Sequence, residues 1–158
     1  MIEFDESQGQ SDSPKEVHQI RLTDFGLSKL IVPGETMYES CGTPAYVAPE
    51  VLHKHGYGKE VDVWSTGVIL YTMLARALPF HDKDKKKTFK LIKEAEPDLK
   101  NEVWPQISEE CKELIRLMLV KDPKSRITIK DALDHPWFAK YKDYIQEIKT
   151  KYHPVIDE

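Results

Sequence analysis

The sequence has little of what marks several specialised classes of protein. Its 158 residues include only two cysteines, Cys41 and Cys111, and no Cys-x-x-Cys pair, which argues against a disulfide scaffold or a zinc ribbon. The longest apolar stretch, residues 61–75, is too short to span a membrane. The first residues are acidic and polar, unlike a signal peptide. We therefore expect a protein of a reducing compartment, the cytoplasm or nucleus, without a membrane partner.

An excess of basic charge is also absent. The 23 lysines and arginines are outnumbered by 27 aspartates and glutamates, which gives a net charge of −4. Residues 1–16 hold five acidic residues and one lysine, so this segment accounts for the whole excess. Such a balance argues against a nucleic-acid partner. Hydrophobic residues make up 40% of the chain and charged residues 32%, as in an ordinary globular domain.

The hydrophobic pattern predicts a mainly α-helical protein with a small β-hairpin. Residues 1–4 and 19–22 have strand character and are joined by a long polar loop. Residues 61–75 are apolar on nearly all sides, which predicts a helix buried on most of its surface, with Trp64 and Met73 in the core. Further helices are expected in four places: residues 84–95, a segment that Ser108 caps, a short segment that Thr128 caps, and the tail 140–152.

Short motifs follow one another in a set order along the chain. They are DFG at residues 24–26, APE at 48–50, DVW at 62–64 and, within DPKSR, Arg126. Each motif alone arises easily by chance, but the order and spacing together are specific. On these residues the chain resembles the C-terminal lobe of a eukaryotic serine/threonine protein kinase. Its segments CGTPAYVAPEVL and DPKSRITIKDALDHPWF are most similar to the calcium/calmodulin-dependent kinase group.

The resemblance implies a protein-kinase fold of which only the C-lobe is present. Residues 1–139 would form this partial domain, and residues 140–158 a tail that begins as an amphipathic helix and ends disordered. Residues 1–4 resemble the strand that follows the catalytic loop, so the sequence is expected to start inside a longer kinase domain. The tail helix would either pack on the lobe or act as a regulatory helix, a site for calmodulin or for a regulatory segment.

The resemblance assigns the DFG motif to nucleotide and metal binding. Asp24 would hold Mg²⁺ on the phosphates of ATP, because a carboxylate suits a hard cation. Phe25 would pack beneath Asp24, and Gly26 would permit a sharp turn of the backbone. Without the other motifs, Asp24 would be an ordinary loop aspartate and Phe25 an ordinary core residue.

The segment before the APE motif would be the substrate-docking loop. It consists of Gly42, Thr43, Pro44, Ala45 and Tyr46. Thr43 would orient the catalytic base and the substrate hydroxyl, and the Ala-Tyr pair favours serine or threonine substrates. The alternative is a plain Gly-Thr-Pro turn, which these residue types form in any protein.

The activation segment lies between the DFG motif and the docking loop. Thr36, Tyr38 and Ser40 are candidate phosphorylation sites. Glu39 stands where many relatives carry a phosphorylatable residue, which implies a segment that is ordered without phosphorylation. A solvated loop glutamate is the alternative.

Three further residues would have structural roles. Glu50 and Arg126 would form a buried ion pair that ties the docking segment to the helical body. Asp62 is the one charge in the apolar stretch 61–75, and an unpaired buried carboxylate is costly. In the family, backbone amides of the catalytic loop satisfy that carboxylate.

Several parts that phosphoryl transfer requires are missing from the sequence. It contains no GxGxxG loop, no VAIK-like lysine, no His-Arg-Asp and no catalytic-loop asparagine. We therefore expect the intact kinase domain to transfer the γ-phosphate of ATP to protein substrates, with the missing N-lobe as a partner. This chain alone should bind neither ATP nor Mg²⁺ tightly and should be inactive. The alternative is a non-catalytic docking module.

One charged segment is left over from these assignments. Residues 83–93 contain six lysines. They form either a solvated helix face or a docking surface for acidic partners.

Overall fold

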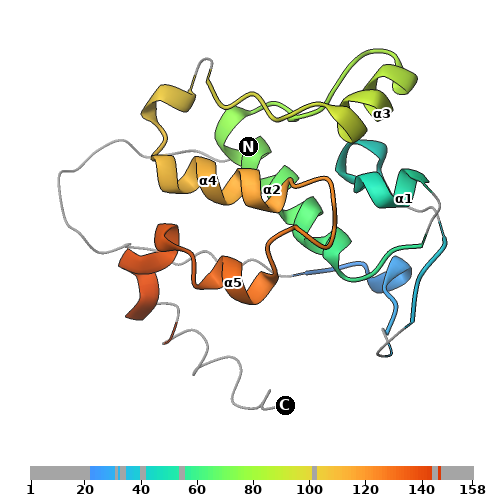
Figure 1. Ribbon diagram of the computed structural model, residues 1–158, viewed down its shortest axis with the longest axis horizontal. Coiled ribbons are helices and arrows are strands. Elements are labelled where there is room, and N and C mark those ends of the chain that lie inside the picture. The colour runs from blue at the N-terminus through green and yellow to red at the C-terminus, as the bar shows by residue number, and fades with distance from the viewer. Residues whose placement is uncertain are drawn as a thin grey trace.

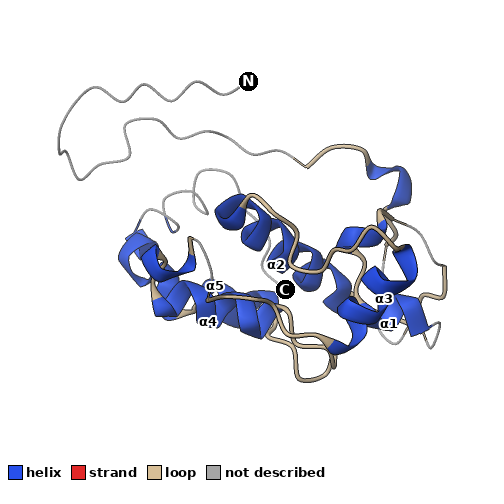
Figure 2. Cartoon of the chain, turned by 90° about the horizontal axis from the view of Figure 1, so that it is seen from above, coloured by secondary structure: helices blue, strands red, loops and turns tan. Residues whose placement is uncertain are grey.

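The computed structural model describes residues 22–30, 32, 35–39, 42–53, 56–100, 103–143 and 146. In these residues the chain is mainly helical, as predicted, and its β-structure is limited to one antiparallel bridge between Met37 and Tyr57 (Figure 2). The predicted hairpin lies outside the described residues, except for Leu22, which is exposed and in no strand. None of the described helices combines the length and apolar character that crossing a membrane requires.

Helix α2 (Glu60–Ala75) is the central element of the structure. Trp64 and Val68 are fully buried on it and belong to the main hydrophobic core. The helix ends where Arg76 adopts a left-handed conformation with φ of 53°, and the Arg76 amide donates to the carbonyl oxygen of Thr72 at 2.9 Å.

Helix α4 (Glu109–Met118) packs directly against α2 (Figure 1). It begins as predicted, with the Ser108 hydroxyl accepting a hydrogen bond from the amide of Cys111 at 3.3 Å. Gly67 on α2 makes the close approach possible, because a Cβ atom at this position would lie 2.8 Å from the Cβ of Met118. The contact between the two helices therefore depends on a glycine in a helix interior.

The remaining helices are short and surround this pair. Helix α5 (Ile129–Leu133) is capped by the hydroxyl of Thr128, as predicted, and α3 (Lys85–Glu94) is capped by the carboxylate of Asp84. The other elements are α1 (Pro49–His53) and the 3-10 turns η1 (Phe25–Leu27), η2 (Pro44–Tyr46), η3 (Trp104–Gln106) and η4 (Pro136–Tyr141). The predicted tail helix from residue 140 lies largely outside the described residues.

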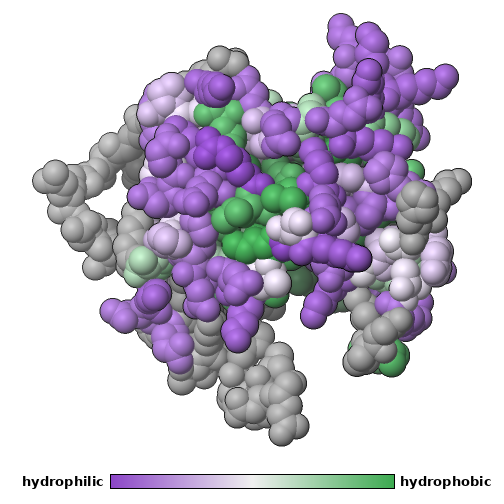
Figure 3. All heavy atoms as spheres, in the orientation of Figure 1, coloured by the Kyte–Doolittle hydropathy of each residue, from purple (hydrophilic) through white to green (hydrophobic). Residues whose placement is uncertain are grey.

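Helix α2 is less buried than its composition predicts. Asp62, Thr66, Ile69 and Met73, spaced at four, three and four residues, form one exposed face of the helix. Met73 is 68% exposed, so its predicted place in the core is wrong. Composition shows only that the helix is apolar. Which of its faces is buried depends on the neighbouring elements, and no described element covers the face that contains Met73. Figure 3 shows a hydrophobic area on the surface where α2 and α4 lie in Figure 1.

Candidate functional site

The DFG segment forms a tight turn that differs from the predicted one. Asp24, not Gly26, has the left-handed backbone, with φ of 61°. Its carboxylate accepts a hydrogen bond from the Gly26 amide at 3.4 Å. A Cβ atom on Gly26 would lie 3.3 Å from the Asp24 carboxylate. The glycine therefore provides space for this oxygen atom, while the aspartate makes the sharp turn, which Asp tolerates better than most residues.

Phe25 also departs from both of its predicted roles. Its side chain is 68% exposed and belongs to neither hydrophobic cluster of the described residues. It neither packs beneath Asp24 nor lies in the core. The described part of the chain provides no apolar surface against which this ring is buried.

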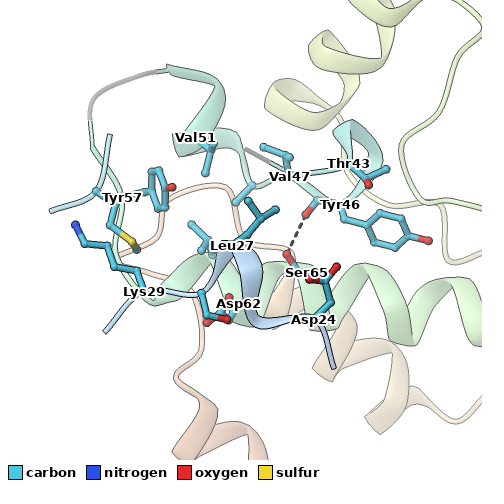
Figure 4. Close-up of a pocket in the computed structure, with 15 residues that line it drawn as sticks. Asp24, Leu27, Lys29, Thr43, Tyr46, Val47, Val51, Tyr57, Asp62 and Ser65 are labelled. Carbon is cyan, nitrogen blue, oxygen red and sulfur yellow. Dashed lines mark hydrogen bonds between the residues drawn. The ribbon is translucent and has the colours of Figure 1, made fainter. Parts of the chain in front are cut away.

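The predicted docking loop is joined to α2. Gly42 has φ of 107°, a conformation that side chains rarely permit, and η2 begins two residues later, after Thr43. The carbonyl oxygen of Tyr46 accepts a hydrogen bond from the Ser65 hydroxyl on α2 at 3.0 Å (Figure 4). Thr43 is exposed and its side chain makes no capping hydrogen bond. The loop is thus fixed through its backbone, and the Thr43 hydroxyl remains exposed.

A cavity of about 420 Å³ brings several of the predicted site residues together, but not Phe25 or Gly26. Its lining includes Asp24, Thr43, Tyr46 and Asp62, which come from the DFG turn, the docking loop and α2. In Figure 4, Asp24 and Asp62 lie at one edge of the cavity, and Thr43 and Tyr46 lie across from them. Residues separated by up to 38 positions in the sequence therefore share one concave surface.

Asp62 is not the buried carboxylate that its apolar surroundings in the sequence predict. It is exposed, and it makes no side-chain hydrogen bond with the described residues. It lies in the first turn of α2, where the helix dipole favours a negative charge. It also lies on the face of α2 that no described element covers, which explains why the carboxylate reaches solvent.

Backbone contacts hold the predicted activation segment against the loop that precedes α2. The amide of Met37 donates to the carbonyl of Tyr57 at 2.9 Å, and the amide of Tyr57 donates back to the carbonyl of Met37 at 2.8 Å. The Tyr57 hydroxyl also donates to the carbonyl oxygen of Glu39 at 2.7 Å. Sequence reasoning considered the Glu39 side chain but missed Tyr57. Ser40 lies outside the described residues, and Thr36 and Tyr38 are exposed.

An ion pair lies at the start of the same segment. Lys29 Nζ is 2.6 Å from a carboxylate oxygen of Glu35. The hydrogen bond between them raises the pKa of Lys29 and lowers the pKa of Glu35. Because both groups are exposed, solvent screens this pair strongly.

Replacing Tyr57 with phenylalanine should loosen the activation segment. The variant loses one hydrogen bond to Glu39, which is worth about 0.5–1.5 kcal/mol. We expect faster amide hydrogen exchange at Met37, which can be measured by NMR. Tyr38→Phe is the matched control, because Tyr38 is exposed and its hydroxyl makes no hydrogen bond with the described residues. Equal exchange rates in the two variants would contradict the prediction.

Glu50 and Arg126 form the buried ion pair that the sequence predicts. Arg126 Nη1 lies 2.7 Å from Glu50 Oε1, and Nη2 lies 2.9 Å from Oε2, so the pair is bidentate. The Arg126 side chain is fully buried and that of Glu50 is 9% exposed. Arg126 also donates to backbone carbonyls of Glu60, Val120 and Lys121. One side chain therefore joins α1, the start of α2 and the loop after α4.

Lys121 is an energetically unusual residue that the sequence pattern did not indicate. Its Nζ atom is buried and has no hydrogen-bond partner in the described residues. It lies 3.9 Å from the ring centre of Phe80 and 4.8 Å from that of Trp64, and these two rings stack on each other. Burial lowers the pKa of Lys121 from 10.5 to about 8, with a smaller opposing contribution from Glu96. Only the fold places the lysine over these rings.

The depressed pKa of Lys121 predicts a pH dependence of stability. Between about pH 8 and 10.5 the folded protein has lost this proton while the unfolded chain retains it. The free energy of unfolding should therefore rise with pH across this window, relative to a Lys121→Met variant. Urea unfolding of both proteins at several pH values measures the difference. Lys87→Met, at an exposed lysine, should keep the pH dependence of the original chain, whereas the same slope in Lys121→Met would refute the prediction.

The cavity offers limited means to hold a metal ion. Asp24 contributes a carboxylate, which has the right chemistry for Mg²⁺. However, the described residues contain no cluster of three His, Cys, Asp or Glu side chains that could bind a metal. The described residues therefore supply one ligand of a magnesium site but do not form a complete site.

Comparison with known proteins identifies the family. Residues 11–138 match the family described as protein kinase domain, so the chain belongs to the protein kinases. The predicted resemblance to the C-lobe of a serine/threonine kinase, most like the calcium/calmodulin-dependent group, is confirmed.

Similar proteins include calcium-dependent protein kinases of plants. Calcium-dependent protein kinase 11 of Oryza sativa subsp. japonica is 50% identical over 123 residues, which are 78% of this chain and 21% of that protein. Calcium-dependent protein kinase 29 of Arabidopsis thaliana is 49% identical over 133 residues, 84% of this chain and 24% of that protein. The chain thus spans about a fifth to a quarter of the length of these relatives.

Proposed function

We propose that this chain is the substrate-docking part of a serine/threonine protein kinase domain. The complete domain transfers the γ-phosphate of ATP to a serine or threonine hydroxyl of a protein substrate. The observation that carries the proposal is the shared cavity of Asp24, Thr43, Tyr46 and Asp62. The two carboxylates of Asp24 and Asp62 and the hydroxyl of Thr43 face one cavity. A purely structural role for these segments does not explain that arrangement, whereas a role in phosphoryl transfer does.

Each of these residues has a role that fits its position. Asp24 contributes one oxygen ligand to the Mg²⁺ that accompanies ATP. Thr43 has an exposed hydroxyl that positions the catalytic base, and residues 42–46 hold the substrate chain. Asp62 is exposed toward the same cavity and without a described partner, which suits it to accept hydrogen bonds from a catalytic loop.

The remaining requirements of phosphoryl transfer lie outside this sequence. The cover over the phosphates, the lysine on them, the second metal ligand and the base are supplied by a complementary part of the domain. The chain alone is inactive. A non-catalytic docking module is the alternative, but the relatives are named as kinases, which favours a part of a catalytic domain.

A complementation experiment tests this proposal. The purified chain is incubated with Mg²⁺, radiolabelled ATP and a serine-containing protein substrate. It is assayed alone and together with a fragment carrying the preceding half of the kinase domain of rice calcium-dependent protein kinase 11. We expect transfer only with both parts, and loss of transfer in Asp24→Asn. Asp134→Asn is the control, since Asp134 is exposed and does not line the cavity.

Two outcomes would overturn the proposal. Turnover by the chain alone would show that the missing parts are not needed. Full transfer by the complemented Asp24→Asn variant would show that Asp24 does not contribute to the metal site.

A further inference from the structure

Helix α3 has a lysine-rich side that the proposed kinase function does not use. Residues 83–93 hold six of the 23 basic residues of the chain. Thr88 and Ile92 are buried against the body of the protein. The lysines on the opposite side of the helix, which we call the lysine face, are Lys86, Lys87, Lys90 and Lys93.

The charge of the lysine face is almost uncompensated. Among the described residues, only Lys90 of the four has a carboxylate within 4 Å, that of Glu94 at 3.9 Å. Lys86 and Lys90 stand four residues apart, where like charges repel each other. The helix dipole disfavours cations in the first turn, where Lys86 and Lys87 stand and no acidic residue follows the cap, but it favours Lys93 in the last turn. Helix stability therefore does not account for Lys86 and Lys87.

A hollow of about 470 Å³ lies beside the lysine face. Lys87 and Lys90 line it together with the apolar side chains of Leu91 and Ala95, and Asp82 and Glu94 complete the lining. The hollow shares no residue with the cavity that contains Asp24. In Figure 3, hydrophilic side chains project from the corner of the molecule that α3 occupies in Figure 1.

We propose that the lysine face and its hollow bind an acidic segment of a partner protein, in which carboxylates flank one apolar side chain. Charge complementarity supports this occupant, because three of the four lysines have no carboxylate partner in the described structure. The apolar side chain enters beside Leu91 and Ala95. A membrane surface fits less well, since the buried residues of α3 face the protein and leave no apolar side to insert into lipid.

Fluorescence anisotropy with a labelled peptide tests the proposal. The probe is Glu-Asp-Glu-Leu-Glu-Asp-Glu, titrated with the full chain at low ionic strength. We expect binding that weakens with added salt. The variant Lys87→Gln/Lys90→Gln should bind about fivefold to tenfold more weakly. Lys100→Gln/Lys130→Gln removes the same charge from exposed positions elsewhere and should bind as the original chain does.

Altered probes separate the parts of the proposal. A peptide with Gln and Asn in place of the acids should not bind, and one with Ser in place of Leu should bind more weakly. Equal binding of the acidic peptide to both double variants would overturn the proposal. Phosphatidylserine vesicles that bind through Lys87 and Lys90, while the peptide does not, would also overturn it in favour of a membrane site. No arm depends on phosphoryl transfer, so the result is independent of the proposed kinase function.

Discussion

Replacing Arg126 with methionine is expected to lower the free energy of unfolding by about 3–5 kcal/mol. The substitution leaves the Glu50 carboxylate buried without its bidentate partner. It also removes the donor to the carbonyl oxygens of Glu60 and Val120. A domain of this size has a total free energy of unfolding of only about 5–15 kcal/mol, so this loss is a large fraction of its stability. Urea unfolding followed by circular dichroism measures the loss.

Two further variants show whether the lost partner causes this effect. Lys124→Met removes a neighbouring exposed charge and should change the stability by less than about 0.5 kcal/mol. The double variant Glu50→Leu/Arg126→Met removes both buried charges, so it should be more stable than Arg126→Met alone. If the double variant is the less stable of the two, the buried charge of Glu50 is not the source of the cost.

Introducing valine at Gly67 is expected to lower the free energy of unfolding by about 1–3 kcal/mol. A Cβ atom at this position would lie 2.8 Å from the Cβ of Met118 and 3.1 Å from Leu119 Cδ2. The backbones of α2 and α4 must then move apart, because the nearest atom belongs to the root of a side chain. At an open helix position, replacing glycine normally raises the free energy of unfolding instead, because glycine there costs roughly 0.5–1 kcal/mol relative to alanine.

Thr66→Val is the matched control for Gly67→Val. Thr66 is the preceding residue of α2 and is exposed, and its hydroxyl donates to the carbonyl oxygen of Asp62 in the same helix at 2.7 Å. Valine there removes this hydrogen bond within α2 but adds no volume, because threonine and valine are nearly the same size. Its thermal unfolding midpoint should stay close to that of the original chain, while that of Gly67→Val falls. Similar midpoints for the two variants would mean that the contact between α2 and α4 is not tight at Gly67.

Several site residues lie where the ordered motifs predict, and others do not. The ion pair of Glu50 and Arg126 and the buried position of Trp64 follow from motif order and hydrophobic pattern. Phe25 and Met73 are exposed although their residue types predicted burial. A side chain is buried only if another part of the protein packs over it. A hydrophobic residue type shows that such packing would be favourable, but not that a packing partner is present.

The turn at the DFG motif shows a second limit of sequence reasoning. Glycine is the usual residue for a left-handed backbone, so Gly26 was the natural candidate. Asp24 takes this conformation instead, because its short carboxylate accepts the Gly26 amide. Both Asp24 and Gly26 can adopt a left-handed backbone. Atomic contacts decide which of them does so, and the residue types alone do not specify those contacts.

The order of the residues alone established the kinase family, the mainly helical body and the helix caps at Ser108 and Thr128. These features are local or depend on short motifs, so a linear pattern carries them. The folded chain was needed to bring Asp24, Thr43 and Asp62 to one cavity, to pair Tyr57 with Glu39, and to place Lys121 over two aromatic rings. Those arrangements depend on how α2 packs with its neighbours, and contacts between residues far apart in the sequence leave no periodic trace in it.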